Sequence, residues 1–160
     1  MKEFPEVSVK EIHSLFLKLA DTFRPEDTVH IYVDGASRGN PGDAGIGVVI
    51  TTEDGKILKA LGKYIGKTTN NVAEYQALIT ALGEAKSLGG TEIKIFADSE
   101  LMVKQIKGEY KVKSAGLLPR YQEAKTLLMK FSKYDIIHIK REKNAEADRL
   151  ANQAIDMKAR

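Results

Sequence analysis

Hydrophobic and polar residues alternate from Thr28 onward, and this period of two predicts a β-strand that ends at Asp34. Residues 44–51 and 56–65 show similar β-strand patterns. The segment 39–42, Gly-Asn-Pro-Gly, has the composition of a tight turn. Because short turns join neighbouring strands in antiparallel pairs, the first half of the domain predicts a three-stranded antiparallel meander.

A helical period replaces this alternation in the rest of the chain. Residues 71–88 carry alanine at every fourth position, which predicts a helix with a small-residue ridge, and Gly89-Gly90 ends it. The later pattern predicts a strand, two helices, a strand and a terminal helix, at 92–97, 100–107, 117–132, 134–140 and 145–157. Strands that alternate with helices indicate an α/β fold.

The N-terminal 27 residues form a separate segment in this interpretation. Ile12, Leu15, Phe16 and Leu19 lie at helical spacing and predict an amphipathic helix over 8–23, which the sequence Arg-Pro-Glu-Asp then ends. Its apolar stripe is short and its polar face is not strongly cationic, so packing against the domain is favoured over membrane or partner contact. The chain thus divides into a helix with linker at 1–27 and a domain at 28–160.

Composition narrows the classes of protein. With 160 residues and 42% hydrophobic content, the chain can form one compact domain. The absence of cysteine excludes disulfides and thiolate zinc sites. No stretch has the length of a membrane span, so we expect a soluble, cytoplasmic protein without a membrane partner. A net charge of +3 is compatible with a polyanionic partner.

Four acids occupy the ends of predicted elements. Asp34 and Asp98 end strands, whereas Glu74 and Asp148 lie in the first turn of a helix, each four residues after an asparagine suited to N-capping. A single acid at such a position is more often a cap or a surface residue. Four acids that converge on one edge of a sheet can hold Mg²⁺ on oxygen ligands, which points to cleavage of a phosphodiester.

The chain resembles the type 1 ribonuclease H family. The stretches that carry this resemblance occur in the family's order, at 32–42, 68–74, 97–99 and 144–151. They cover roughly Val29 to Ile155. The resemblance implies a five-stranded mixed sheet flanked by helices, in which strands 1 to 3 are antiparallel and strands 4 and 5 run parallel to the central first strand.

The same resemblance implies an activity and its catalytic residues. The chain would be a metal-dependent endonuclease that hydrolyses the RNA strand of RNA/DNA hybrids and leaves 5′-phosphate and 3′-hydroxyl ends. Asp34, Glu74, Asp98 and Asp148 would be both the catalytic residues and the metal ligands. They would hold two Mg²⁺ ions, for which Mn²⁺ is a possible substitute, with Asp34 bridging the pair.

Several polar residues match family positions that contact the substrate. Asn40, Asn70 and Asn71 would contact the RNA strand beside the cleavage site, since amides offer both donors and an acceptor. Turn and cap formation is the alternative interpretation of these asparagines. Thr69 falls where the family contacts a DNA phosphate, although a threonine at a helix start is ordinarily a cap.

Other positions depart from the family's pattern. The loop 140–143 after the last strand contains no histidine, and His138 is interpreted as an ordinary strand residue. Arg141 is a candidate contact for the departing phosphate or a solvated charge. Glu100 replaces the glutamine of many members at a position that recognises RNA. Asn144, the expected helix cap, completes the candidate substrate-binding set.

The substrate-gripping region is shorter than in many relatives. Residues 104–113 carry four lysines around Tyr110, and they would either track a phosphate backbone or form an ordinary exposed surface. Two alternatives to hybrid cleavage stay open: a related nuclease that acts on double-stranded RNA or branched DNA, and a non-catalytic nucleic-acid-binding module. The second is weaker, because a binding module has no use for four mutually repelling carboxylates. We expect a monomer.

Overall fold

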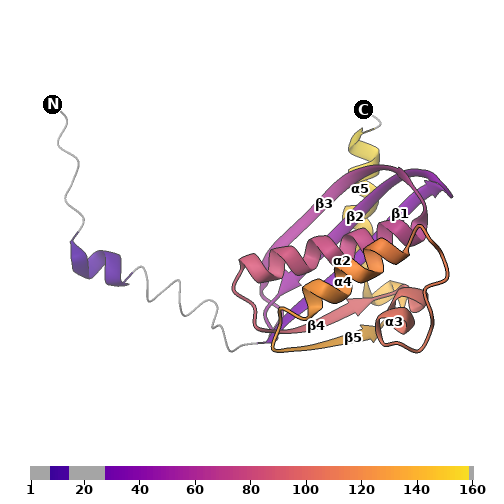
Figure 1. Ribbon diagram of the computed structural model, residues 1–160. Helices are drawn as coiled ribbons and strands as arrows, with labels where there is room; N and C mark the ends of the chain where they lie inside the picture. The colour runs from indigo at the N-terminus through magenta and orange to yellow at the C-terminus, as the bar shows by residue number, and fades with distance from the viewer. Residues whose placement is uncertain (1–7, 15–27, 159–160) are drawn as a thin grey trace.

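The computed structural model describes residues 8–14 and 28–158 of the chain. Figure 1 shows its helices and strands, which follow in the order β1 Thr28–Gly39, β2 Gly42–Thr51, β3 Ile57–Thr68, α2 Asn70–Ser87, β4 Glu92–Ala97, α3 Glu100–Ile106, α4 Leu118–Leu128, β5 Lys133–His138, the 3₁₀ turn η1 Arg141–Lys143 and α5 Ala145–Lys158. The predicted succession of strands and helices is confirmed.

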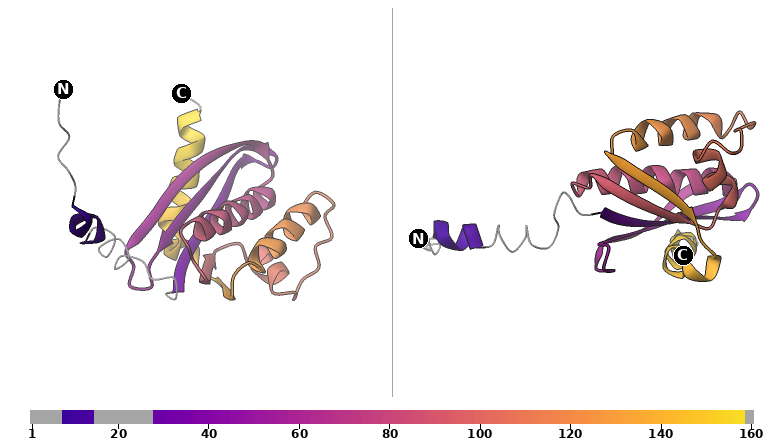
Figure 2. Two further views of the ribbon diagram at one scale, coloured as in Figure 1. Left: turned by 60° about the vertical axis from the view of Figure 1, so that its left-hand side comes forward. Right: turned by 90° about the horizontal axis from the view of Figure 1, so that it is seen from below.

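The strands form one five-stranded mixed sheet of order β3-β2-β1-β4-β5. β1 pairs antiparallel with β2, and β2 with β3, whereas β4 is parallel to both β1 and β5. Helices α2 and α4 cover one face of the sheet and α5 crosses the other (Figure 2). The predicted fold class, with β1 at the centre, is therefore confirmed.

The prediction that the first strand ends at Asp34 is wrong. β1 continues to Gly39, where a φ of +101° begins the turn into β2, and Asp34 pairs with Gly47 of β2. On the other side of β1, the parallel pairing with β4 does stop just before Asp34, at the pair Val33 and Ala97. Asp34 therefore stands beyond the last β4 pair although it lies inside a longer strand.

The helix boundaries also correct the prediction. Thr69, not Asn70, caps α2, because its hydroxyl accepts a hydrogen bond from the Val72 amide at 3.2 Å. Glu74 consequently lies in the second turn, and the first turn contains no acid. Helix α4 ends at Leu128, four residues earlier than predicted, since the chain turns there into β5.

The two faces of the sheet achieve close packing by opposite means. On α2, the predicted alanine ridge is completely buried, at Ala73, Ala77, Ala81 and Ala85. On the α5 face the small residues are in the sheet: a β-carbon on Gly47 would lie 1.9 Å from the Ala147 oxygen, and one on Gly62 would lie 2.5 Å from the Leu150 oxygen. Glycine at these positions lets the α5 backbone contact the strands directly.

The N-terminal segment is described only in part. Residues 9–14 are helical, within the predicted helix over 8–23. Ile12, from the predicted apolar stripe, is 55% exposed. Leu15, Phe16 and Leu19 lie outside the described residues, so packing of this segment on the domain stays a prediction. Among the described residues, no helix has both the length and the apolar character needed to cross a membrane.

Candidate metal centre

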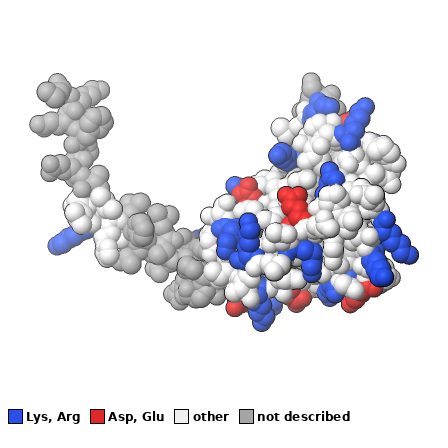
Figure 3. Space-filling view, in the orientation of Figure 1, with Lys and Arg blue, Asp and Glu red and all other residues white. Residues whose placement is uncertain are grey.

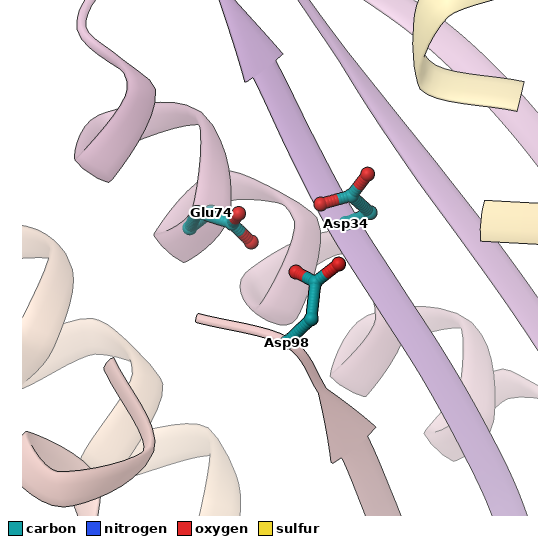
Figure 4. A group of neighbouring side chains, drawn as sticks. All are labelled: Asp34, Glu74 and Asp98. Atoms are coloured by element: carbon teal, nitrogen blue, oxygen red, sulfur yellow. The ribbon is translucent and has the colours of Figure 1, made fainter. Parts of the chain in front are cut away.

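Three of the four predicted acids meet at one point. Oxygen atoms of Asp34, Glu74 and Asp98 all lie within 4.8 Å of one another. Figure 4 shows their carboxyl groups turned toward a common point from β1, from α2 and from the end of β4. Asp34 is 5% exposed and Glu74 is 4% exposed, so two of these charges are withdrawn from water.

Gly35 explains how Glu74 reaches the strand. A β-carbon at Gly35 would lie 2.3 Å from both the Ala73 carbonyl carbon and the Glu74 nitrogen, so only glycine lets α2 approach β1 this closely. The Gly35 amide then donates a hydrogen bond to Glu74 Oε2 at 3.1 Å. In the core beside the site, the Tyr75 hydroxyl donates to Gln105 Oε1 at 2.6 Å and joins α2 to α3.

Strand pairing explains the proximity of Asp34 and Asp98. Val33 and Ala97 are register partners in the parallel pair of β1 and β4; Asp34 follows Val33 within β1, and Asp98 directly follows the last residue of β4. Side chains at the carboxyl ends of neighbouring parallel strands lie at the same sheet edge. Ser99 follows Asp98 and caps α3, accepting a hydrogen bond from the Met102 amide at 3.3 Å.

Burial and like charge make this cluster unfavourable when ionised. Burial, together with the negative charge of Asp98 and the contact with Asp148, raises the pKa of Asp34 to about 8. Burial raises the pKa of Glu74 well above its ordinary value, and the charges of Asp34 and Asp98 add to this effect. A divalent cation would remove the repulsion, and a donor set made only of oxygens suits Mg²⁺ or Mn²⁺.

Asp148, the fourth acid, belongs to the same site but not to the tight cluster. It lies in the first turn of α5, as predicted, and its side chain is in hydrogen-bonding contact with Asp34. A cavity of about 500 Å³ is lined by all four acids. Two groups donate to Asp148 Oδ1, Arg141 Nη2 and Asn152 Nδ2, each at 3.2 Å.

The three predicted substrate asparagines differ in their relation to this cavity. Asn70 lines it, and the main-chain N–H of Asn70 donates to Asn40 Oδ1 at 3.1 Å, so these two residues are neighbours despite their separation in sequence. Asn71 is exposed in the first turn of α2 and is not among the lining residues. For Thr69 the structure supports the cap interpretation, through its bond with Val72.

Three other predicted residues have different surroundings. Arg141 lines the cavity and forms an ion pair with Asp148, so it is not merely a solvated charge. Glu100 is outside the lining and pairs with Lys104 at 2.8 Å. Substrate contact by Asn144 is not supported, because this residue is 1% exposed and its Nδ2 donates to the Val33 carbonyl oxygen at 2.8 Å. This hydrogen bond connects the start of α5 to β1.

The sequence interpretation missed several residues of the cavity wall. Asn152 lines it and lies four residues after Asp148, so helical spacing alone could have indicated it. His138 also lines the cavity, although it was interpreted as an ordinary strand residue. Its position follows from the pairing of β5 with β4, in which His138 is opposite Ala97, and no local pattern reveals that register.

Comparison with known proteins gives the same class of fold. The structure of a ribonuclease H1 from Halobacterium salinarum is 44% identical, with a TM-score of 0.79 over 81% of this chain and 98% of that one. The structure of LC11-RNase H1 in complex with RNA/DNA hybrid is 47% identical, with a TM-score of 0.79 over 82% of this chain and 99% of that one. The sheet and its acidic edge thus define a ribonuclease H-like protein.

Sequence relatives agree. Residues 32–154 match the family model described as reverse transcriptase-like. A ribonuclease HI of Halobacterium salinarum is 44% identical over 80% of this chain, which spans 64% of that protein. A bifunctional protein of Mycobacterium tuberculosis is 46% identical over 82% of this chain, which spans only 36% of it. The chain belongs to the reverse transcriptase-like family and, within it, to the type 1 ribonuclease H proteins.

Proposed function

We propose that this chain is a metal-dependent endonuclease that cuts the RNA strand of RNA/DNA hybrids and leaves 5′-phosphate and 3′-hydroxyl ends. One observation carries the proposal: three carboxylates from β1, α2 and β4 come within 4.8 Å of one another, at a cavity that a fourth carboxylate also lines. Such an arrangement is costly without cations. A divalent metal site accounts for it.

Each acid has a distinct part in this proposal. The Asp34 side chain is in contact with those of both Glu74 and Asp148, so Asp34 would be the residue shared by two cations. Glu74 and Asp98 would complete one site, and Asp148 the other. Bound Mg²⁺ or Mn²⁺ would supply the Lewis acidity that activates the attacking water and stabilises the leaving 3′ oxygen.

The surface beside the cavity suits a nucleic-acid strand. Figure 3 shows Lys and Arg side chains spread over the face that carries α2 and α4, with few acidic side chains among them. A groove of about 430 Å³ near the start of α2 is lined by Lys63, Lys67 and Arg120, which favours a phosphate backbone. This groove is a candidate path for the DNA strand.

The asparagine pair supports the choice of RNA as the strand that is cut. Asn70 lines the cavity and is hydrogen-bonded to Asn40, both residues are exposed, and their remaining amide groups can donate to or accept from a 2′-hydroxyl. LC11-RNase H1, the relative solved in complex with RNA/DNA hybrid, shares 47% of its sequence with this chain. Cleavage of a hybrid is therefore the activity that we expect first.

A cleavage assay tests the proposal. Labelled RNA/DNA hybrid, RNA duplex, DNA duplex and branched DNA are incubated with Mg²⁺, Mn²⁺ or EDTA, and product ends are mapped. We expect the RNA strand of the hybrid to be cut only with metal. Asp34→Asn should abolish cleavage, whereas Asp135→Asn, which removes an exposed carboxyl group outside the cavity, should not.

Other outcomes would change the assignment. Preferential cutting of RNA duplex or branched DNA would indicate a related nuclease with a different target. Tight binding of hybrid without turnover by the parent chain would indicate a binding module. Metal-independent cleavage, or full activity of Asp34→Asn, would contradict the role that we assign to the acids.

A further inference from the structure

Asn152 lies one helical turn after Asp148 on α5, and both side chains line the acidic cavity. Residues four apart stand next to each other on one face of a helix. Asn152 Nδ2 is 3.0 Å from the main-chain oxygen of Asp148 and 3.2 Å from its Oδ1. An amide nitrogen has two hydrogens, which is enough for both of these hydrogen bonds.

Asp148 Oδ1 also accepts from a second donor. Arg141 Nη2 lies 3.2 Å from this oxygen, at the same distance as Asn152 Nδ2. An oxygen that already accepts two hydrogen bonds has little lone-pair density left for a cation. Oδ2 is therefore the oxygen of Asp148 that stays available for a cation, in a side chain that is also in contact with Asp34.

The two donors differ in how firmly they are held. The Arg141 side chain is 75% exposed, so water and salt compete for its ion pair with Asp148. Asn152 is half-buried, and the helix fixes its distance from Asp148. The reverse orientation of its amide would place oxygen against two oxygens, which is unfavourable. Asn152 is consequently the more permanent of the two donors.

We propose that Asn152 is a positioning residue that holds Asp148 Oδ1 in a hydrogen bond and so leaves Oδ2 available for a metal ion. It acts through Asp148 and contacts neither metal nor substrate in this role. The proposal rests on the function proposed above, since it assumes that these acids bind metal. Loss of a hydrogen bond that supports a metal ligand lowers metal affinity by about 10- to 100-fold, so we expect an effect of about tenfold.

Calorimetric titration of the full chain with Mn²⁺ alone tests this role without nucleic acid. Asn152→Leu removes the amide group that donates to Asp148 and keeps a similar side-chain volume. Gln153→Leu is the matched control, because Gln153 is the neighbouring residue on α5, is exposed and contacts Arg149 but not Asp148. Asp148→Asn identifies the binding step that depends on Asp148. We expect Asn152→Leu, but not Gln153→Leu, to weaken that step about tenfold and to leave the other step unchanged.

Kinetics provide a second readout that a general structural defect would not reproduce. The Mg²⁺ concentration for half-maximal hybrid cleavage should rise by about the same factor, while KM for the hybrid at saturating Mg²⁺ stays constant. Asn152→Ala, which cannot clash on a helix, replaces the leucine variant if that variant does not fold. Parent-like Mn²⁺ binding by the folded variant, or equal weakening of both steps, would overturn the positioning role. A parent chain that binds no Mn²⁺ would instead contradict the proposed function.

Discussion

The two helices that bring acids to the cavity hold them in different ways. Glu74 is 4% exposed and is fixed by the packing of α2 on Gly35, inside the hydrophobic core. The Asp148 side chain is 28% exposed and is held by hydrogen bonds from Arg141 and Asn152 at the surface. The α2 side of the site therefore depends on the shape of the core, and the α5 side depends on polar contacts.

This difference indicates a division of tasks between the two sides. The tight cluster of Asp34, Glu74 and Asp98 cannot relax without moving α2 or the sheet, so it resembles a preformed site. Asp148 has no such packing around it, and its orientation depends on the two donors to Oδ1. Under the proposed function, the α2 side would hold a first ion through core packing, whereas the α5 side would hold a second ion through a ligand oriented by hydrogen bonds.

The largest effects on stability should come from substitution of the glycines that pack against a helix, and Gly35→Ala is the one on the α2 side. The added β-carbon would lie 2.3 Å from the backbone of Ala73 and Glu74, so α2 must move away from β1. We expect a loss of about 3 kcal/mol in the free energy of unfolding, measured by urea denaturation, together with weaker Mn²⁺ binding. Both metal-binding steps should weaken, since Glu74 and the core around Asp34 move together.

Two glycine variants sharpen this prediction. Gly83→Ala lies on α2 with nothing within 4 Å of the new β-carbon, so it should stabilise the protein by about 0.5 to 1 kcal/mol. Gly47→Ala would push α5 outward through Ala147 and should weaken mainly the metal-binding step that depends on Asp148. Equal effects of Gly35→Ala and Gly47→Ala on both steps would contradict the division between the two sides.

The next effect is a pH dependence of stability caused by Asp34. Its pKa rises from 3.8 to about 8 on folding, so between these values the folded chain keeps a proton that the unfolded chain releases. Stability from this group is thus fully present below pH 3.8 and falls as pH rises to about 8. In EDTA, we expect Asp34→Asn to be more stable than the parent by several kcal/mol at pH 8 and similar to it near pH 4.

Thermal melts across this pH range provide the measurement. Asp135→Asn is the control, because it removes a carboxyl group that is exposed on β5. Adding Mg²⁺ at pH 8 should raise the melting temperature of the parent chain and should have little effect on Asp34→Asn. A difference in melting temperature between parent and Asp34→Asn that does not change with pH would show that the surroundings do not raise the pKa of Asp34.

Much of the α2 side was predictable from the sequence, and the reason is its periodicity. The alanine spacing of α2 and the alternation of the strands both reflect burial in one core, so they reveal which faces meet. The four acids could be assigned because family motifs place them. The position of Asp34 beyond the last β4 pair could not be derived, since it depends on register between β1 and β4, which are distant in sequence.

The α5 side was less predictable for a related reason. From the sequence, Asn144 is a candidate for substrate binding or helix capping, yet its side-chain amide donates a hydrogen bond to the Val33 carbonyl oxygen. His138 and Arg141 reach the cavity only because β5 ends beside β4 and η1 turns the chain toward α5. Contacts that depend on how separate elements dock leave no periodic signal in the sequence.

A smaller effect should follow the loss of the hydrogen bond between Tyr75 and Gln105. Tyr75→Phe leaves the Gln105 side chain, which is 3% exposed, without this partner and loosens the contact of α2 with α3. We expect a destabilisation of about 1 to 2 kcal/mol in urea denaturation. Tyr134→Phe, at an exposed position on β5, is the control and should change stability by less than about 0.5 kcal/mol.

The smallest effect on stability should be that of Arg141→Leu, and it bears directly on the comparison of the two sides. The exposed ion pair of Arg141 with Asp148 should contribute less than about 0.5 kcal/mol, as judged by urea denaturation. Because Asn152 still donates to the same oxygen, the Asp148-dependent Mn²⁺ step should weaken less in Arg141→Leu than in Asn152→Leu. Lys143→Leu, two residues along the same turn and outside the cavity lining, should leave that step unchanged. A larger effect of Arg141 than of Asn152 on Mn²⁺ binding would mean that charge, not a fixed hydrogen bond, orients Asp148.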